Sequence, residues 1–218
     1  MKLDKKNKIL VKEIIEWSCC IIIAIIIALL FRFYIATPTE VRMRSMFPTL
    51  KEGDRLILNR TIRISHKNPS HGDIITFEAP SKKKYMESEI DLNNPIAKYE
   101  NEPQNILERF KHYVLEWGKE SYIKRVIATQ GEHVQIKNGK VYINDNVIDE
   151  EYLQHDIITE IDGAGFSDFI VPKNCVFAMG DNRTESTDCR NFGCIPIEKI
   201  EGVVYVRIWP FNKIGTNI

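Results

Sequence analysis

Three polar segments carry side chains that could do chemistry together. In the first, residues 44–50, Ser45 lies on a predicted turn three residues before Pro48. A serine hydroxyl is a weak nucleophile and needs an adjacent base to take its proton. Taken alone, this segment is more typical of a structural turn than of a catalytic site.

A candidate base lies in the β-favouring run at residues 122–127. Strand alternation places Lys124 on one face with Tyr122 and Val126, and puts Arg125 on the other face. Desolvation disfavours the ammonium form, so a lysine held against apolar neighbours has a lowered pKa and can act as a general base near neutral pH. The alternative is a lysine whose ammonium group extends out to water.

The third segment, residues 180–193, is rich in the Gly, Asn, Asp and Ser that tight turns require. Charges of both signs lie close together there, which suits a loop held by ion pairs and hydrogen bonds. Alone it could be a solvated loop or a calcium loop. The calcium alternative is weak, because the acidic residues lack alternate-position spacing and Arg183 and Arg190 would oppose a cation.

These segments follow an apolar run near the start of the chain. Residues 1–17 hold five lysines against three acidic residues, and residues 17–36 carry one charge, Arg32, near their end. At about 1.5 Å per residue, the run would span about 30 Å of bilayer as a helix. The positive-inside rule then puts residues 1–16 in the cytoplasm and residues 37–218 outside. A cleaved signal peptide and a buried helix are the alternatives, but bulky Tyr34 departs from a signal-peptide cleavage site.

Residues 37–218 show mostly short β-favouring runs separated by turn signals. Asn138-Gly139 between two such runs predicts a hairpin with a type I′ turn. Many short strands without alternating helices indicate an all-β body. We therefore expect a mostly β protein: a single transmembrane helix, then an antiparallel β-sheet or barrel-like catalytic domain with a small helical insertion.

The insertion occupies residues 81–120. Five apolar residues near its end recur at helical spacing and predict an amphipathic helix of about three to four turns: Ile106, Leu107, Phe110, Val114 and Trp117. We expect the apolar face of this helix to pack on the β body. A helix on the membrane surface is the alternative, since lysines lead into the insertion and a tryptophan suits the interface. A disordered segment is the third.

Composition excludes other classes. The chain has 218 residues with 30 basic and 30 acidic side chains, which argues against a nucleic-acid binder with a basic surface. Five cysteines are too few for a disulfide scaffold, although Cys189 and Cys194 could bridge. There is no Cys-x-x-Cys pair, and the histidines do not cluster with the cysteines, so we expect no metal and no cofactor.

Together the three segments resemble the bacterial type I signal peptidases, which are membrane-anchored serine proteases that remove signal peptides. The family's serine box, Ser-Met-x-Pro-Thr-Leu, matches residues 45–50, and its lysine box, Tyr-hydrophobic-Lys-Arg-hydrophobic-Ile, matches residues 122–127. Its last box, Gly-Asp-Asn-Arg-x-x-Ser-x-Asp-Ser-Arg, matches residues 180–190, except that Cys189 replaces the second serine. The resemblance covers nearly all of the chain except the insertion.

The resemblance implies a role for each matched residue. Ser45 would be the nucleophile, with its backbone N–H donating to the oxyanion, and neutral Lys124 the base. Ser186 would orient the lysine. The other implied roles are ionic support and a shallow pocket for small side chains: Asp188, Arg190, Asp181 and Arg183 for the first, and Val41, Met46, Leu50, Tyr122 and Ile123 for the second. Many members place Ser or Gly two residues before the nucleophile, where this chain has Met43, which supplies no second oxyanion donor.

The resemblance also implies partners and a location. Secretory pre-proteins would be the substrates, and the anchor would lie in the lipid bilayer of the plasma membrane. Nothing in the sequence indicates the oligomeric state. The alternatives are a self-cleaving repressor-type Ser–Lys protease, which would not need the anchor, a membrane-anchored cysteine transpeptidase using Cys175, and a membrane-tethered β binding module without activity.

Overall fold

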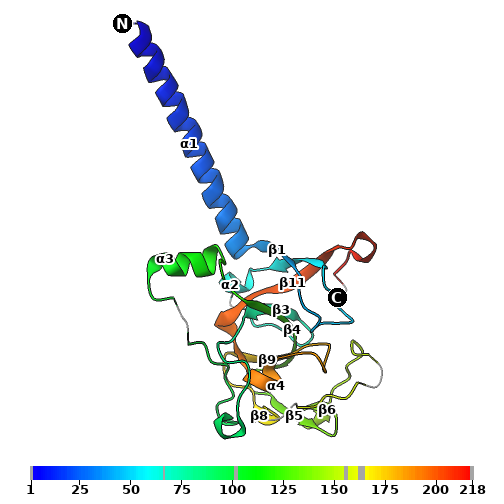
Figure 1. The fold of residues 1–218 in the computed structure, drawn as a ribbon. Helices are drawn as coiled ribbons and strands as arrows, with labels where there is room; N and C mark the ends of the chain where they lie inside the picture. The colour runs from blue at the N-terminus through cyan, green and yellow to red at the C-terminus, as the bar shows by residue number, and fades with distance from the viewer. Residues whose placement is uncertain (1, 66, 101–102, 155–156, 162–164, 217–218) are drawn as a thin grey trace.

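The computed structural model describes residues 2–65, 67–100, 103–154, 157–161 and 165–216. It shows a long N-terminal helix, α1 (Lys2–Tyr34), that projects from a β body (Figure 1). The part of α1 at Ile9–Tyr34 is long and apolar enough to cross a membrane: its most apolar 18-residue window has a mean hydropathy of 2.8, and none of that window is buried among the described residues. A helix with no polar face and no protein around it is suited to a membrane.

The helix ends slightly before the expected span does. Residues 17–36 were the expected span, but α1 stops at Tyr34 and Ala36 already begins strand β1 (Ala36–Glu40). The reason is pairing: Ala36 lies opposite Asn59 in an antiparallel ladder, which requires extended backbone. The limits of the membrane-spanning part within α1 stay a prediction.

A seven-stranded sheet forms the part of the β body nearest α1. Every pair in it is antiparallel. Its order across the sheet is β1, β2 (Arg55–Asn59), β11 (Ile200–Trp209), β3 (Ile74–Glu78), β4 (Ser121–Thr129), β9 (Cys175–Met179) and β10 (Ile195–Pro196). The central strands β3, β4 and β9 are buried over most of their length, which makes them a stiff support for side chains.

A smaller four-stranded antiparallel sheet lies at the end of the molecule away from α1 (Figure 1). Its order is β7 (Asn146–Val147), β6 (Lys140–Ile143), β5 (His133–Lys137) and β8 (Asp168–Ile170). The predicted hairpin joins β5 to β6, and both Asn138 and Gly139 have positive φ, at 53° and 73°. Two successive positive φ angles are the mark of the type I′ turn, so the prediction is confirmed.

Within the described ranges, the helices of the body are all short. They are α2 (Ile62–Ser65), η1 (Glu87–Glu89), α3 (Ile106–Arg109), the π-helical turn η2 (Phe110–Val114), α4 (Cys189–Phe192), η3 (Ile197–Lys199) and η4 (Phe211–Lys213). The mostly antiparallel β fold with one long N-terminal helix is therefore confirmed.

The insertion departs from expectation. Its helix is the continuous pair α3–η2, shorter than the predicted three to four turns, and it lies beside the end of α1 (Figure 1). The prediction that its apolar face packs on the β body is wrong, because Ile106, Leu107, Phe110 and Trp117 are exposed. Polar side chains face the body instead: His112 and Lys119 both pair with Glu78 of β3.

The main core lies between the two sheets and includes Phe77, Phe177 and Phe192. Three cysteines are buried in this core, and all five cysteines of the chain are free. The possible bridge between Cys189 and Cys194 is therefore not formed. The Cys189 sulfur instead accepts the backbone N–H of Ala178, at 3.2 Å.

Candidate active site

Ser45 and Lys124 meet, although 79 positions separate them in the chain. The Lys124 Nζ donates to the Ser45 Oγ at 2.7 Å, and the two residues are 1% and 5% exposed. Ser45 lies on the turn that follows β1, and Lys124 lies in the middle of β4. A hydroxyl and an amine at this distance can exchange a proton directly.

Burial sets the charge of Lys124. In the sheet Lys124 pairs with Ile75 of β3, which is fully buried, and its Nζ lies 5.4 Å from the centre of the Tyr122 ring. Desolvation in this apolar setting lowers the pKa of Lys124 to about 8, although the negative charge of Asp188 opposes the shift. Of the two alternatives for this lysine, the buried one with a lowered pKa is therefore present, and a large fraction of the amine is neutral near pH 8.

The loop after β9 holds the serine turn. The backbone N–H of Asn182 donates to the Ser45 carbonyl at 3.0 Å, and the Asn182 side chain donates to the Arg44 carbonyl at 3.2 Å. Gly180 permits this approach, because a Cβ at that position would overlap both the Ser45 carbonyl oxygen and the Ser186 hydroxyl. Gly180 and Asn182 are thus positioning residues that the list of predicted side chains missed, although both belong to the third segment.

Ser186 lies close to the dyad but makes no bond to it. Its Oγ is buried and has no hydrogen-bond partner among the residues that the structure describes. The close approach of Ser186 to Gly180 puts the hydroxyl beside the Ser45 backbone. Its role in orienting Lys124 therefore stays a prediction.

Asp188 and Arg190 form a buried ion pair next to the dyad. The guanidinium binds the carboxylate in bidentate fashion, with two N···O distances of 2.9 Å, and Asp188 also accepts the Gly180 N–H at 3.0 Å. Burial would raise the pKa of Asp188, but the Arg190 charge and these hydrogen bonds hold it below its usual value. The pair stabilises the loop that carries Gly180.

Asp181 and Arg183 belong to two separate ion pairs. Asp181 binds Arg125 of β4 through N···O distances of 2.9 and 2.7 Å, and it accepts the Thr49 hydroxyl at 2.5 Å. Arg183 binds Glu150. Arg125, Thr49 and Glu150 were not predicted as site residues. Arg125 could have been predicted from strand alternation, which places it on the face opposite Lys124. No local pattern indicates Glu150, which is 33 positions from Arg183.

A groove of about 390 Å³ runs from the neighbourhood of the dyad towards the end of α1. Three of the predicted pocket residues line it: Val41, Tyr122 and Ile123. The other two, Met46 and Leu50, do not. Both are fully buried in an apolar cluster with Leu56 and Ile74, since the turn directs them into the body. Exposed Met43 lines the groove as well.

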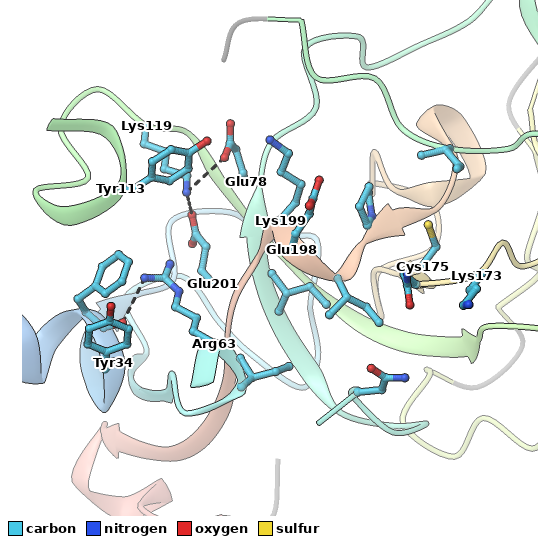
Figure 2. Close-up of a pocket in the computed structure, with 18 residues that line it drawn as sticks. Tyr34, Arg63, Glu78, Tyr113, Lys119, Lys173, Cys175, Glu198, Lys199 and Glu201 are labelled. Carbon is cyan, nitrogen blue, oxygen red and sulfur yellow. Dashed lines mark hydrogen bonds and ion pairs between the residues drawn. The ribbon is translucent and has the colours of Figure 1, made fainter. Parts of the chain in front are cut away.

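A larger cavity, of about 870 Å³, lies away from the dyad, between the end of α1, the insertion and the β body (Figure 2). Figure 2 shows Lys119 of the insertion between Glu78 and Glu201, with N···O distances of 3.5 and 2.8 Å. Because these charges satisfy one another, they support the insertion rather than a reaction.

The larger cavity also contains Cys175, the residue that a transpeptidase would need as its nucleophile. Burial raises the pKa of this thiol to about 11, which disfavours the reactive thiolate. Within the described part of the chain, no three or more His, Cys, Asp or Glu side chains are grouped so that they could hold a metal ion.

The fold and the site together define an anchored antiparallel β protein with a buried serine–lysine pair. The model of the family described as signal peptidase, peptidase S26, matches residues 14–209. The chain therefore belongs to the signal peptidase family.

Individual relatives agree. The chain is 31% identical over 195 residues to thylakoidal processing peptidase 1, chloroplastic, of Arabidopsis thaliana, covering 89% of this chain and 48% of that protein. It is 27% identical to signal peptidase IB of Staphylococcus aureus, covering 94% and 95% of the two chains. The chain thus spans about half the length of the thylakoidal relative and nearly all of the staphylococcal one.

Among solved structures, signal peptidase I from Enterococcus faecalis is similar at 23% identity and a TM-score of 0.40, over 63% of this chain and 97% of that one.

Proposed function

We propose that this protein is a membrane-bound serine endopeptidase that removes N-terminal signal peptides from exported pre-proteins. Membership of the signal peptidase family supports this proposal. The observation that carries it is the buried contact of 2.7 Å between the Lys124 Nζ and the Ser45 Oγ, together with the lowered pKa of Lys124.

The chemistry follows from these two groups. Neutral Lys124 takes the proton of Ser45 as the Oγ attacks the scissile carbonyl, and the Ser45 backbone N–H donates to the resulting oxyanion. Lys124 then gives that proton to the leaving amine, which breaks the peptide bond and leaves an ester on Ser45. Water, activated by the same amine, hydrolyses the ester and restores the hydroxyl.

The groove would select the substrate. Val41, Tyr122 and Ile123 line the groove of about 390 Å³ that starts near the dyad. The residues that precede the cut would lie there in extended form, with small side chains at the first and third positions before the cut, as the resemblance to the signal peptidases implies. A rigid wall rejects a larger side chain because it cannot take the added volume.

The proposed location is supported by α1. The helix anchors the protein in a membrane, as in a family of anchored peptidases. The lysine-rich start favours a cytoplasmic N-terminus and a catalytic body on the outer side of the plasma membrane, where secretory pre-proteins emerge from the lipid bilayer.

The test is direct cleavage by the full chain in detergent. A secretory precursor with Ala at the first and third positions before the expected cut should be split once, at that bond, as mass analysis of both products shows. Ser45→Ala should abolish cleavage and Cys175→Ala should not. An uncut precursor, or activity that survives Ser45→Ala, would overturn the proposal.

A further inference from the structure

The end of the insertion presents an apolar surface that no described part of the protein covers. We call residues 106–117 the insertion foot. Ile106, Leu107, Phe110 and Trp117 in this foot are 87%, 64%, 42% and 76% exposed. Apolar side chains exposed together on one short segment indicate a contact with something outside the protein.

Glu116 determines where the foot lies relative to the anchor. Its carboxylate is 3.2 Å from Arg32 and 2.5 Å from Arg60, and it also lies 3.9 Å from Arg63. Arg32 is in the last turn of α1 and is the only charged residue in its apolar run from residue 17 onwards. The foot is therefore held against the last turn of the anchor, as Figure 1 also shows for α3.

This tether fixes the depth of the foot. For the apolar run of α1 that starts at residue 17 to lie in hydrocarbon, the bilayer surface must fall near Arg32, whose guanidinium reaches the interface. Glu116 touches that guanidinium, and Trp117 follows it directly in the chain. Trp117 thus lies at the depth where tryptophan is favoured, between the headgroups and the acyl chains.

The charges of the foot suit the same surface. Its exposed charged side chains are Glu108, Arg109 and Lys111. Glu116 instead forms ion pairs with Arg32 of the anchor and Arg60 of the body. Two basic groups against one acidic group next to large apolar residues are the pattern of a segment that lies in a headgroup layer.

We propose that the insertion foot is a second membrane contact, whose occupant is the lipid bilayer at the level of the headgroups and upper acyl chains. Glu116 is the positioning residue that sets its depth. The inference rests on anchoring by α1 and not on the proposed cleavage reaction, so its test needs no substrate. With one helix alone the body could pivot about the anchor. A second contact holds the groove at a constant height above the membrane.

The experiment measures the depth of Trp117 in the full chain, reconstituted in vesicles of phosphatidylcholine and phosphatidylglycerol. The background is Trp17→Phe with Trp209→Phe, which leaves Trp117 as the single tryptophan. Lipids brominated in the upper acyl chain should quench its emission by about half or more, because bromine quenches only on contact and the ring lies at that depth. Acrylamide in the water should quench it weakly.

The matched control carries its single tryptophan far from the anchor. Val147→Trp, with all three native tryptophans changed to Phe, places the ring on β7, which pairs with β6 at the end of the body away from α1. Val147 is exposed, so the change is tolerated. Brominated lipid should leave this emission unchanged to within about 10%, while acrylamide quenches it strongly.

Two results would overturn the membrane contact, and a third would overturn the role of Glu116. If acrylamide quenches Trp117 as strongly as it quenches the control, and brominated lipid does not quench it, the foot lies in water. If neither acrylamide nor brominated lipid quenches the Trp117 emission, the foot is covered by a protein partner or by a second copy of this chain. Glu116→Gln should at least halve the quenching of Trp117 by brominated lipid. If that quenching stays at its full value in the variant, Glu116 is not the residue that positions the foot.

Discussion

At the scale of single residues, Lys124 must be neutral in order to act. Its pKa is lowered from 10.5 to about 8, so the amine is charged and inactive well below pH 8 and neutral above it. We therefore expect kcat/KM for a signal-peptide substrate to rise with pH and to reach half its plateau near pH 8. Initial rates at low substrate concentration between about pH 6 and pH 10 measure this midpoint.

A flat profile, or a midpoint near the ordinary lysine value, would contradict Lys124 as the base. Lys124→Arg gives a second readout: guanidinium does not deprotonate in proteins, so the variant should lose about 10²-fold to 10⁴-fold in kcat/KM. Lys173→Arg makes the same change at an exposed site and should keep full activity.

Ser186 is expected to matter less than either member of the dyad. Its Oγ has no hydrogen-bond partner in the described part of the chain, so Ser186→Ala removes no bond that the structure shows. Activity should fall by less than about tenfold, whereas Ser45→Ala removes the nucleophile and should abolish it. A loss with Ser186→Ala as large as with Ser45→Ala would instead place this hydroxyl in the proton path.

At the scale of elements, the loop at residues 180–193 is a scaffold built on one buried ion pair. Arg190→Gln would leave the fully buried carboxylate of Asp188 without its cation. We expect the free energy of unfolding to fall by about 3–5 kcal/mol, as measured by chemical denaturation in detergent at pH 7. Asp188 has a lowered pKa, so the stability it contributes is present at neutral pH and is lost as the pH falls through that lowered value.

The control for that loss is Lys82→Gln. Lys82 pairs with Glu89 across side chains that are about a third exposed, so its removal should lower the free energy of unfolding far less than Arg190→Gln does. Equal losses from Lys82→Gln and Arg190→Gln would show that burial of the Asp188 pair has no special importance.

The contact between this loop and the serine turn depends on the absence of a side chain at residue 180. In Gly180→Ala the new Cβ would overlap the Ser45 carbonyl oxygen, so the turn must shift. Because catalysis depends on positioning to within about 1 Å, we expect kcat to fall by about 10²-fold. Steady-state kinetics on protein of wild-type secondary structure measures the effect.

Gly53→Ala is the matched glycine change, since its new Cβ meets no atom within 4 Å. Its φ of +86° makes alanine strained, so it should lower stability slightly but leave kcat near the wild-type value. Unchanged kcat in Gly180→Ala would show that the contact does not position Ser45.

At the scale of the whole molecule, function requires the body to face the side from which pre-proteins emerge. The basic start predicts that residues 37–218 lie outside the cell. Protease added to intact spheroplasts should therefore degrade the body and spare a short fragment containing the N-terminus and α1, as detected with an N-terminal tag. Protection of the body with removal of the N-terminal tag would reverse the topology and remove the proposed function.

Several features could be predicted because they depend on neighbours in the chain. A period of two indicates strands, Asn-Gly indicates a type I′ turn, and a long uncharged run indicates a membrane helix. The three polar segments are also local, and their resemblance to the boxes of the signal peptidases identified Ser45 and Lys124 before any contact was known. Strand alternation showed that Lys124 has apolar neighbours within its strand, but it left open whether the ammonium group reaches water; burial in the folded body decided that its pKa is lowered.

Only the tertiary structure decided which distant segments of the chain are in contact. The bond from Arg125 to Asp181 spans 56 positions, and no local pattern favours that partner over another carboxylate. The helix of the insertion was predicted to bury its apolar face, yet Glu116 holds it against the anchor, where that face points away from the β body. Periodicity shows that a helix has an apolar face, whereas what covers that face depends on the surfaces and charges that the rest of the chain brings beside it.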